Sequence, residues 1–163
     1  MSVSNTHETR VAHRRLTKQE FPFMKTLLFK VEHGDWSAEL QLPAIESLEE
    51  LANAIIKAVG FEMDHCYGFY NNLRQYFDST EEYTLFSDIG EDCRESDTGV
   101  QGTCLADVFQ PEKKMLFLFD YGDDWMFPLV CTGEMDTKPF KRPKLLSTKG
   151  VPPEQYPDFA EGT

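Results

Sequence analysis

The sequence predicts an α+β fold in which one main helix packs on a mixed β-sheet. Residues 27–42 alternate apolar and polar side chains with the period of two that is typical of strands, and a turn sequence at 33–35 interrupts them. Apolar residues then recur with helical spacing over 48–59. Two apolar stretches late in the chain, 115–119 and 125–131, indicate a second hairpin. A hairpin, a helix and further strands in this order are typical of an α+β domain.

Both strands of the first hairpin bury one face. The first contains LLFKV (27–31), and the second, WSAELQL (36–42), alternates more regularly. Because His33-Gly34-Asp35 between them is a typical turn sequence, the two strands are expected to pair antiparallel. Pro43 ends the second strand.

The helix over 48–59 has clear start and stop signals. Ser47 and Glu50 have the spacing of a capping box, which satisfies free amide groups at a helix start. Gly60 can adopt the left-handed conformation that closes a helix. One apolar stripe runs along the helix and consists of Leu48, Leu51, Ala52, Ile55 and Val59.

The middle of the chain predicts shorter elements. We expect strands at 66–70 and 83–86, and an exposed acidic loop over 88–102. A short helix is expected within 104–109, with Thr103 as its N-cap.

The last predicted strands differ in their surroundings. The stretch MLFLF (115–119) is apolar on both faces, which indicates a central strand. Pro128 in the strand 125–131 favours an edge position or a bulge, because proline cannot donate to a ladder. The resulting arrangement is β-grasp-like, and no internal repeat is apparent.

Three regions follow from these patterns. Residues 1–22 lack apolar periodicity and are expected to form a flexible tail, and 23–137 form the α+β domain. Residues 138–163 are rich in proline and lysine, so they are expected to wrap the surface or to be partly mobile.

Composition and charge exclude several classes of protein. No apolar run approaches the roughly 20 residues of a membrane span, and the N-terminus lacks the hydrophobic core of a secretory signal, so a cytoplasmic location is expected. The four cysteines show no CxxC spacing, which disfavours a zinc ribbon, and Cys66 and Cys131 lie in apolar patterns, where a buried thiol is the simpler interpretation.

The charge of the chain is unevenly distributed. The net charge is −12, and residues 26–137 carry six basic and 23 acidic residues, whereas 138–149 contain five basic residues and no acid. An acidic body disfavours nucleic acid and anionic membranes. The basic flanks can simply lie against that body, or they can form an interaction site.

Two stretches resemble a known family. SLEELANAIIKAVGFEMDHCYGF (47–69) and FDYGDDW (119–125) resemble the signatures of the plasmid pRiA4b ORF-3-like family, whose members are often passengers of mobile elements. The similarity covers roughly residues 24–157. It implies the fold and a mobile-element context, and it implies no particular reaction.

The sequence departs from the family pattern in three places. Trp36-Ser37-Ala38 stands where members usually carry Trp-Arg-Arg, and Phe61 stands where a tryptophan is usual. The segment Pro-Pro-Glu-Asp-x-Gly-Gly survives only as Pro152-Pro153-Glu154, followed by Gln155-Tyr156.

Carboxylates around the FDYGDDW turn are the first candidate site. Asp120, Asp123 and Asp124 could bind a hard cation such as magnesium or calcium, or they could serve the turn itself by capping backbone amides while Gly122 supplies a positive φ. His65 could pair with Asp120 or Asp124 as a general base, or could make a structural hydrogen bond.

Aromatic residues near these acids are the second candidate site. With His65, the side chains of Tyr67, Tyr121 and Trp125 could bind a peptide or a cationic ligand, although aromatic residues at strand spacing usually belong to the core. The sequence contains no P-loop, nucleophile elbow or HExxH motif and implies no cofactor.

The leading hypothesis is therefore a non-enzymatic binding or accessory domain that acts through contact with a protein partner. The alternative is a metal-binding or hydrolytic protein that uses His65, Asp120, Asp123 and Asp124. Oligomeric state has no signature in the sequence.

Overall fold

The structure, a computed structural model, describes residues 22–90 and 98–158. One sheet contains the strands β1 (Met24–His33), β2 (Trp36–Pro43), β3 (Tyr67–Tyr70), β4 (Glu82–Thr84), β5 (Thr98–Gly99), β6 (Lys114–Phe119), β7 (Trp125–Thr137) and β8 (Lys144–Lys149). The helices are α1 (Leu48–Val59), α2 (Leu85–Ile89) and α3 (Leu105–Val108), with a 3₁₀ turn, η1, at Tyr76–Asp78. The predicted tail, 1–22, lies almost wholly outside the described residues, as does much of the predicted loop 88–102.

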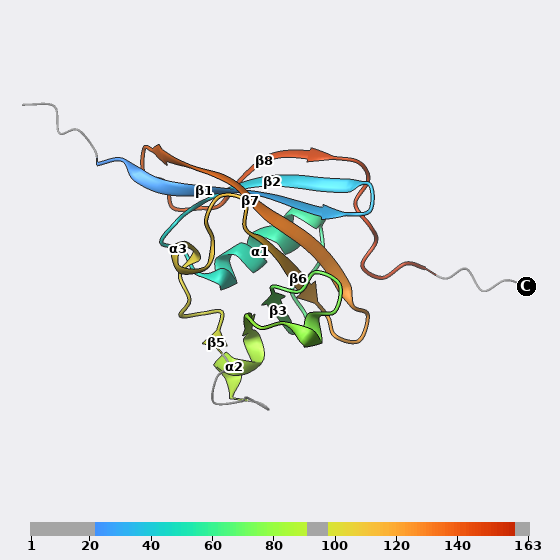
Figure 1. Cartoon of the computed structure of the whole chain (residues 1–163). Coiled ribbons are helices and arrows are strands. Elements are labelled where there is room, and N and C mark those ends of the chain that lie inside the picture. Colours follow the sequence, from blue (N-terminus) through green and yellow to red (C-terminus); the bar gives the residue numbers. More distant parts are fainter. Residues whose placement is uncertain (1–21, 91–97, 159–163) are drawn as a thin grey trace, which may run out of the picture.

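The eight strands have the order β5-β4-β3-β6-β7-β1-β2-β8 (Figure 1). Neighbouring strands are antiparallel except β4 and β5, which are parallel, so the sheet is mixed. This sheet with one long helix confirms the α+β class. The strand order does not confirm the narrower β-grasp label.

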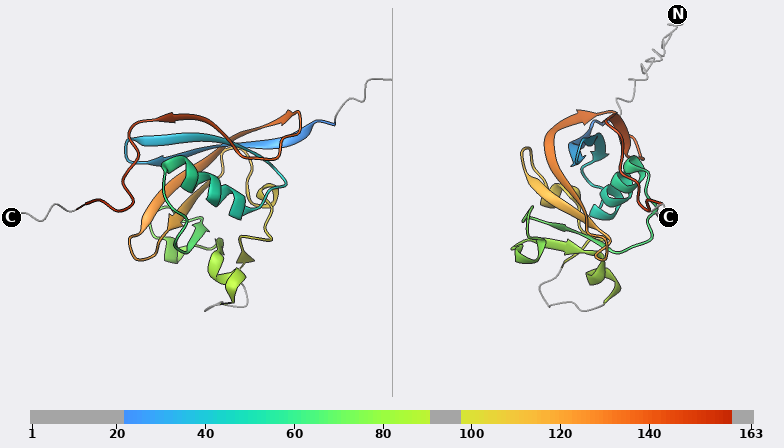
Figure 2. Two further views of the ribbon diagram at one scale, coloured as in Figure 1. Left: turned by 180° about the vertical axis from the view of Figure 1, so that it is seen from behind. Right: turned by 90° about the vertical axis from the view of Figure 1, so that its right-hand side faces the viewer.

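The sheet curls around α1, and the main core lies between them (Figure 2). Helix α1 contributes the buried residues of its apolar stripe, and β1, β2, β6 and β7 contribute the facing side chains. A smaller cluster, built on Tyr70, Leu116 and Leu118, lies on the opposite face of β3 and β6. Alternate residues of β6 therefore belong to different clusters, which explains why this strand is apolar on both faces.

Helix α1 begins and ends where the sequence predicts. The Glu50 amide donates to the Ser47 hydroxyl over 3.3 Å, and Gly60 has a φ of 83°. The amide of Gly60 donates to the carbonyls of Ile56 and Lys57 and so satisfies the last turn. None of the described helices is both long enough and apolar enough to cross a bilayer.

The first hairpin and the central position of β6 are confirmed, whereas the predicted position of Pro128 is wrong. Strand β7 lies between β6 and β1, so Pro128 is in an internal strand. The register irregularity of β7 against β1 falls at Thr132, not at Pro128. The proline is accommodated because the pairing of β7 with β1 stops at Leu129, so Pro128 needs no ladder hydrogen bond to β1, although β1 itself continues to His33.

Three further expectations need correction. The predicted strand 83–86 ends at Thr84, whose hydroxyl accepts from the Ser87 amide and starts α2 instead. The N-cap of α3 is Cys104, because the Thr103 hydroxyl donates to the Gly99 carbonyl. Cys131 is buried as expected, whereas Cys66 is only half-buried.

The C-terminal segment contains a strand that the sequence analysis did not predict. Strand β8 pairs antiparallel with β2 and forms the end of the described sheet. All six of its residues are exposed, so neither face of the strand is buried. A strand without a buried face does not need alternating apolar residues, which are the signal by which strands are predicted.

Candidate functional site

The FDYGDDW turn is held together by the first of its aspartates. The Asp120 carboxylate accepts hydrogen bonds from the amides of Gly122 (3.0 Å) and Asp123 (3.3 Å). The Asp124 amide donates to the Asp120 carbonyl over 2.7 Å. The left-handed positions are Asp120 (φ 63°) and Asp124 (φ 50°), and Gly122 is not among the glycines with positive φ. The expected role of Gly122 is therefore wrong, because the aspartates adopt the strained conformation themselves.

His65 lies beside this turn because β3 and β6 pair antiparallel. The Tyr67–Phe119 pair ends the ladder, and the Asp120 amide donates to the Cys66 carbonyl over 2.9 Å. As a result, His65 Nε2 is 3.5 Å from Asp120 Oδ2. The sequence analysis allowed this pairing, with Asp124 as the alternative to Asp120.

Asp64 is the second carboxylate at His65 and was not predicted. His65 Nδ1 lies 2.7 Å from Asp64 Oδ1. This hydrogen bond raises the pKa of His65, and the charges of Asp120 and Asp123 act in the same direction while burial opposes them. In its protonated form the ring can donate to Asp64 and to Asp120 at once.

The C-terminal segment closes over Asp64. Gln155 exchanges two hydrogen bonds with the main chain of Glu62 (2.7 and 3.1 Å) and donates to Asp64 Oδ1 over 3.0 Å. The Tyr156 hydroxyl donates to Asp64 Oδ2 over 2.6 Å, which lowers the pKa of Asp64 and raises that of Tyr156 to about 12. Gln155 and Tyr156 stand directly after Pro152-Pro153-Glu154, where the sequence departs from the family pattern. That departure was the one feature of the sequence that could have indicated their role.

The structure separates the four aromatic and histidine residues that the sequence grouped as a ligand site. His65 and Tyr67 line the same cavity. Tyr121 lies on the opposite face of the sheet, where its hydroxyl is 2.6 Å from that of Tyr70 and burial raises the pKa of Tyr121. Trp125 packs edge-on against Phe61 with ring centroids 4.9 Å apart.

The predicted metal ligands do not form a metal site in the part of the chain that the structure describes. Within 22–90 and 98–158, no three His, Cys, Asp or Glu side chains are arranged to hold a metal ion. One oxygen of Asp120 is committed to the amides of the turn. The geometry supports the turn-forming role of these aspartates more directly than a cation site.

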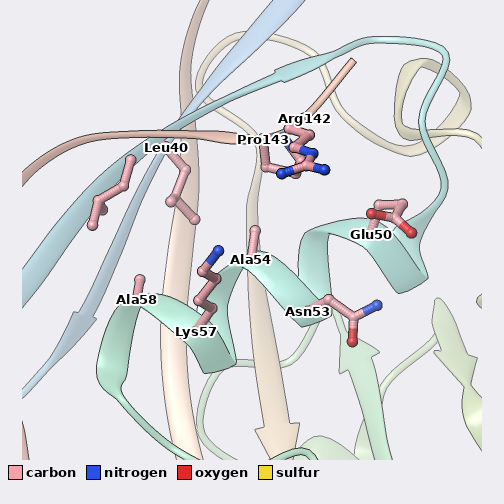
Figure 3. A pocket seen from close by; sticks show the side chains of 9 residues that line it. Leu40, Glu50, Asn53, Ala54, Lys57, Ala58, Arg142 and Pro143 are labelled. Atoms are coloured by element: carbon pink, nitrogen blue, oxygen red, sulfur yellow. The ribbon is translucent and has the colours of Figure 1, made fainter.

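Helix α1 has a cavity on each side. The first, called here the β8 cavity, has a volume of about 370 Å³ and lies between α1, β2 and the segment that leads into β8 (Figure 3). It is lined by Leu40, Glu50, Asn53, Ala54, Lys57, Ala58, Arg142, Pro143 and Leu145. The second, the His65 cavity, has a volume of about 300 Å³ and is lined by Glu49, Asn53, Met63, Asp64, His65, Cys66, Tyr67 and Leu85. Asn53 lines both cavities.

The β8 cavity combines an apolar floor with two cations. In Figure 3, Lys57 and Arg142 reach into the opening from α1 and from the chain before β8, and Glu50 lies in the first turn of the helix. Neither Lys57 nor Arg142 forms an ion pair with any residue of 22–90 or 98–158. The sequence did not predict this site, because it depends on the pairing of β8 with β2.

Comparison with known proteins gives the family. The family model for plasmid pRiA4b ORF-3-like proteins matches residues 32–160, and the chain belongs to this family. A crystal structure of a protein of unknown function from Methanosarcina mazei Go1 has a similar fold, with a TM-score of 0.60 and 16% sequence identity over 79% of this chain and 72% of that chain. No curated protein matches the sequence.

Proposed function

We propose that the protein is a non-enzymatic binding module that recognises a protein partner in the β8 cavity. The partner contributes an exposed segment that carries both acidic and apolar side chains. The observation that carries this proposal is the presence of Lys57 and Arg142, without ion pairs among the described residues, above an apolar floor in a protein of net charge −12. The family description refers to a plasmid gene, which supports an accessory role.

Charge complementarity supports an acidic partner. The basic segment 138–149 includes β8, and none of its five basic side chains forms an ion pair with the described residues. Lys144 instead lies 4.1 Å from the centroid of the Phe140 ring. A strip of unsatisfied cations beside an acidic body favours an acidic partner.

Exposed apolar side chains on β8 support a protein segment as the partner. Leu145 and Leu146 are 53% and 49% exposed, and Leu145 lines the cavity. Apolar contacts give affinity, and the cations give orientation and specificity. Nucleic acid would satisfy the cations but would leave these leucines unused.

The test is a titration with short peptides of defined charge. We expect the full chain to bind the acetylated peptide DLEVD more tightly than the neutral peptide NLQVN or the basic peptide KLKVK, because only the first satisfies Lys57 and Arg142. Removing either cation, with Lys57→Ala or Arg142→Ala, should weaken binding of the acidic peptide by about 1 kcal/mol, or about fivefold. Isothermal titration calorimetry gives the affinities.

The matched control is Lys114→Ala, since Lys114 is an exposed lysine of β6 that forms no ion pair with the described residues and lies several strands from β8. This substitution changes the net charge by the same amount and should leave peptide affinity unchanged. Equal loss in all three variants would mean that the effect is general electrostatics, which contradicts the proposal. Tighter binding to an oligonucleotide duplex than to the acidic peptide would indicate nucleic acid as the partner instead. A dimeric mass that Arg142→Ala abolishes would indicate that the partner is a second copy of this chain.

The second candidate function, a metal-binding or hydrolytic protein, has one supporting observation. His65 Nε2 lies 3.5 Å from Asp120 Oδ2, a geometry in which a carboxylate can orient an imidazole that accepts a proton. Among the described residues, the Tyr156 hydroxyl lies 3.5 Å from His65 Nδ1, but it already donates to Asp64 over 2.6 Å, so the binding module remains the stronger proposal.

A further inference from the structure

The His65 cavity is lined by a buried tyrosine whose hydroxyl has no hydrogen-bond partner among the described residues. Tyr67 is only 2% exposed, and its hydroxyl makes no hydrogen bond to any residue of 22–90 or 98–158. Among the described side chains, Trp125 Nε1 is the polar atom that is both fully enclosed and unpaired. The Tyr67 oxygen is therefore not fully enclosed, and the cavity that Tyr67 lines is the space it reaches. A buried polar group in this position requires water or a ligand.

Acidic residues lie near enough to this hydroxyl to act on it electrostatically. Burial raises the pKa of Tyr67, and the charges of Glu49 and Asp88 raise it further, so the phenol stays neutral in a negative field. Glu49 lines the cavity, and the hydrogen bond to its carboxylate is a long one of 3.4 Å from Gln101 Nε2. Its carboxylate therefore retains acceptor capacity for a ligand.

The other charged groups of the cavity are already balanced. The Asp64 carboxylate accepts hydrogen bonds from Gln155 and Tyr156 and contacts His65. The ring of His65 lies between Asp64 and Asp120, so two carboxylates offset its positive charge when it is protonated. Glu49 and Tyr67 are thus the groups that determine which ligand enters.

We propose that the His65 cavity is a second binding site, independent of the β8 cavity, which takes a small organic cation of the primary alkylammonium class. The ammonium group donates to the Glu49 carboxylate and to the Tyr67 hydroxyl oxygen. The alkyl chain lies against Met63 and Leu85, the apolar residues of the wall. A volume of about 300 Å³ is at the lower end of the range for ligand pockets, which suits a short chain.

The probe for this site is n-butylammonium, and n-butanol is its uncharged control. Titration into the isotopically labelled full chain should give saturable NMR shifts of residues around Tyr67 with the amine, and much weaker binding of the alcohol. Tyr67→Phe keeps the ring and removes the hydroxyl, and Glu49→Gln keeps the shape and removes the charge. Each should weaken amine binding about fivefold, as expected for one lost hydrogen bond or ion contact.

The control variant is Lys57→Ala, which alters only the β8 cavity and should leave amine affinity unchanged. Thermal melting of each variant establishes that it is folded, and Glu49→Gln keeps the test decisive if Tyr67→Phe does not fold. Equal affinity for the amine and the alcohol would overturn the proposal. So would unchanged amine binding in both Tyr67→Phe and Glu49→Gln, or the absence of saturable binding at millimolar amine. Peptide binding at the β8 cavity is measured separately. A negative result for one cavity therefore does not count against the proposal for the other.

Discussion

Truncation of Leu51 tests whether the main core depends on α1. Leu51 is 0% exposed and lies within the cluster that joins the helix to the sheet. Leu51→Ala removes three carbon atoms, each worth roughly 0.8 kcal/mol of transfer free energy, and leaves a cavity between α1 and the sheet. The free energy of unfolding should therefore fall by about 3–4 kcal/mol.

Two substitutions nearby in the chain serve as references for the loss of stability expected for Leu51→Ala. Ser47→Ala removes a capping hydrogen bond of 3.3 Å and should cost about 1 kcal/mol. Ile45→Ala, at a residue that is 77% exposed, should change stability by less than about 0.5 kcal/mol. Urea unfolding followed by circular dichroism measures all three. A smaller loss for Leu51→Ala than for Ser47→Ala would refute the packing of α1 described above.

Two further predictions concern the turn and its histidine. Millimolar magnesium, calcium, manganese or zinc should not raise the melting temperature above that in chelator; a rise of several degrees that Asp123→Asn and Asp124→Asn abolish would support a metal site instead. Because the folded-state pKa of His65 is raised, its contacts with Asp64 contribute stability that is fully present below the unfolded pKa, about 6.5, and is lost as pH rises through the folded pKa. NMR titration of His65 should give a pKa above 6.5, and Asp64→Asn should lower it; a value at or below 6.5 in the unmodified protein would contradict the hydrogen bond.

Local signals made α1 predictable, and long-range pairing made β8 unpredictable. Ser47, Glu50 and Gly60 lie next to the helix they delimit, so their spacing is visible in the sequence. The residues of β8 are exposed, and only the hydrogen bonds to β2 define them as a strand. Tyr156 and Asp64 are also far apart in the sequence, so their contact could not be predicted from it.

Backbone conformation explains why part of the candidate site was predicted and part was not. Antiparallel pairing of β3 with β6 brings His65 to Asp120, one of the two carboxylates that the sequence analysis offered as its partner. The left-handed φ of Asp120 then interrupts the alternation of the strand, so Tyr121 lies on the opposite face from Phe119. Period-two reasoning cannot anticipate such a reversal, because it assumes extended backbone throughout.

Peptide binding at the β8 cavity can be tested most directly by mapping where an acidic, apolar peptide binds. The measurement is the set of backbone amide shifts in the labelled full chain on titration with the peptide DLEVD. The proposed function predicts saturable shifts concentrated at Lys57, Arg142 and Leu145, which line the β8 cavity. Shifts centred on His65 and Tyr67, or no saturable shifts at all, would contradict it.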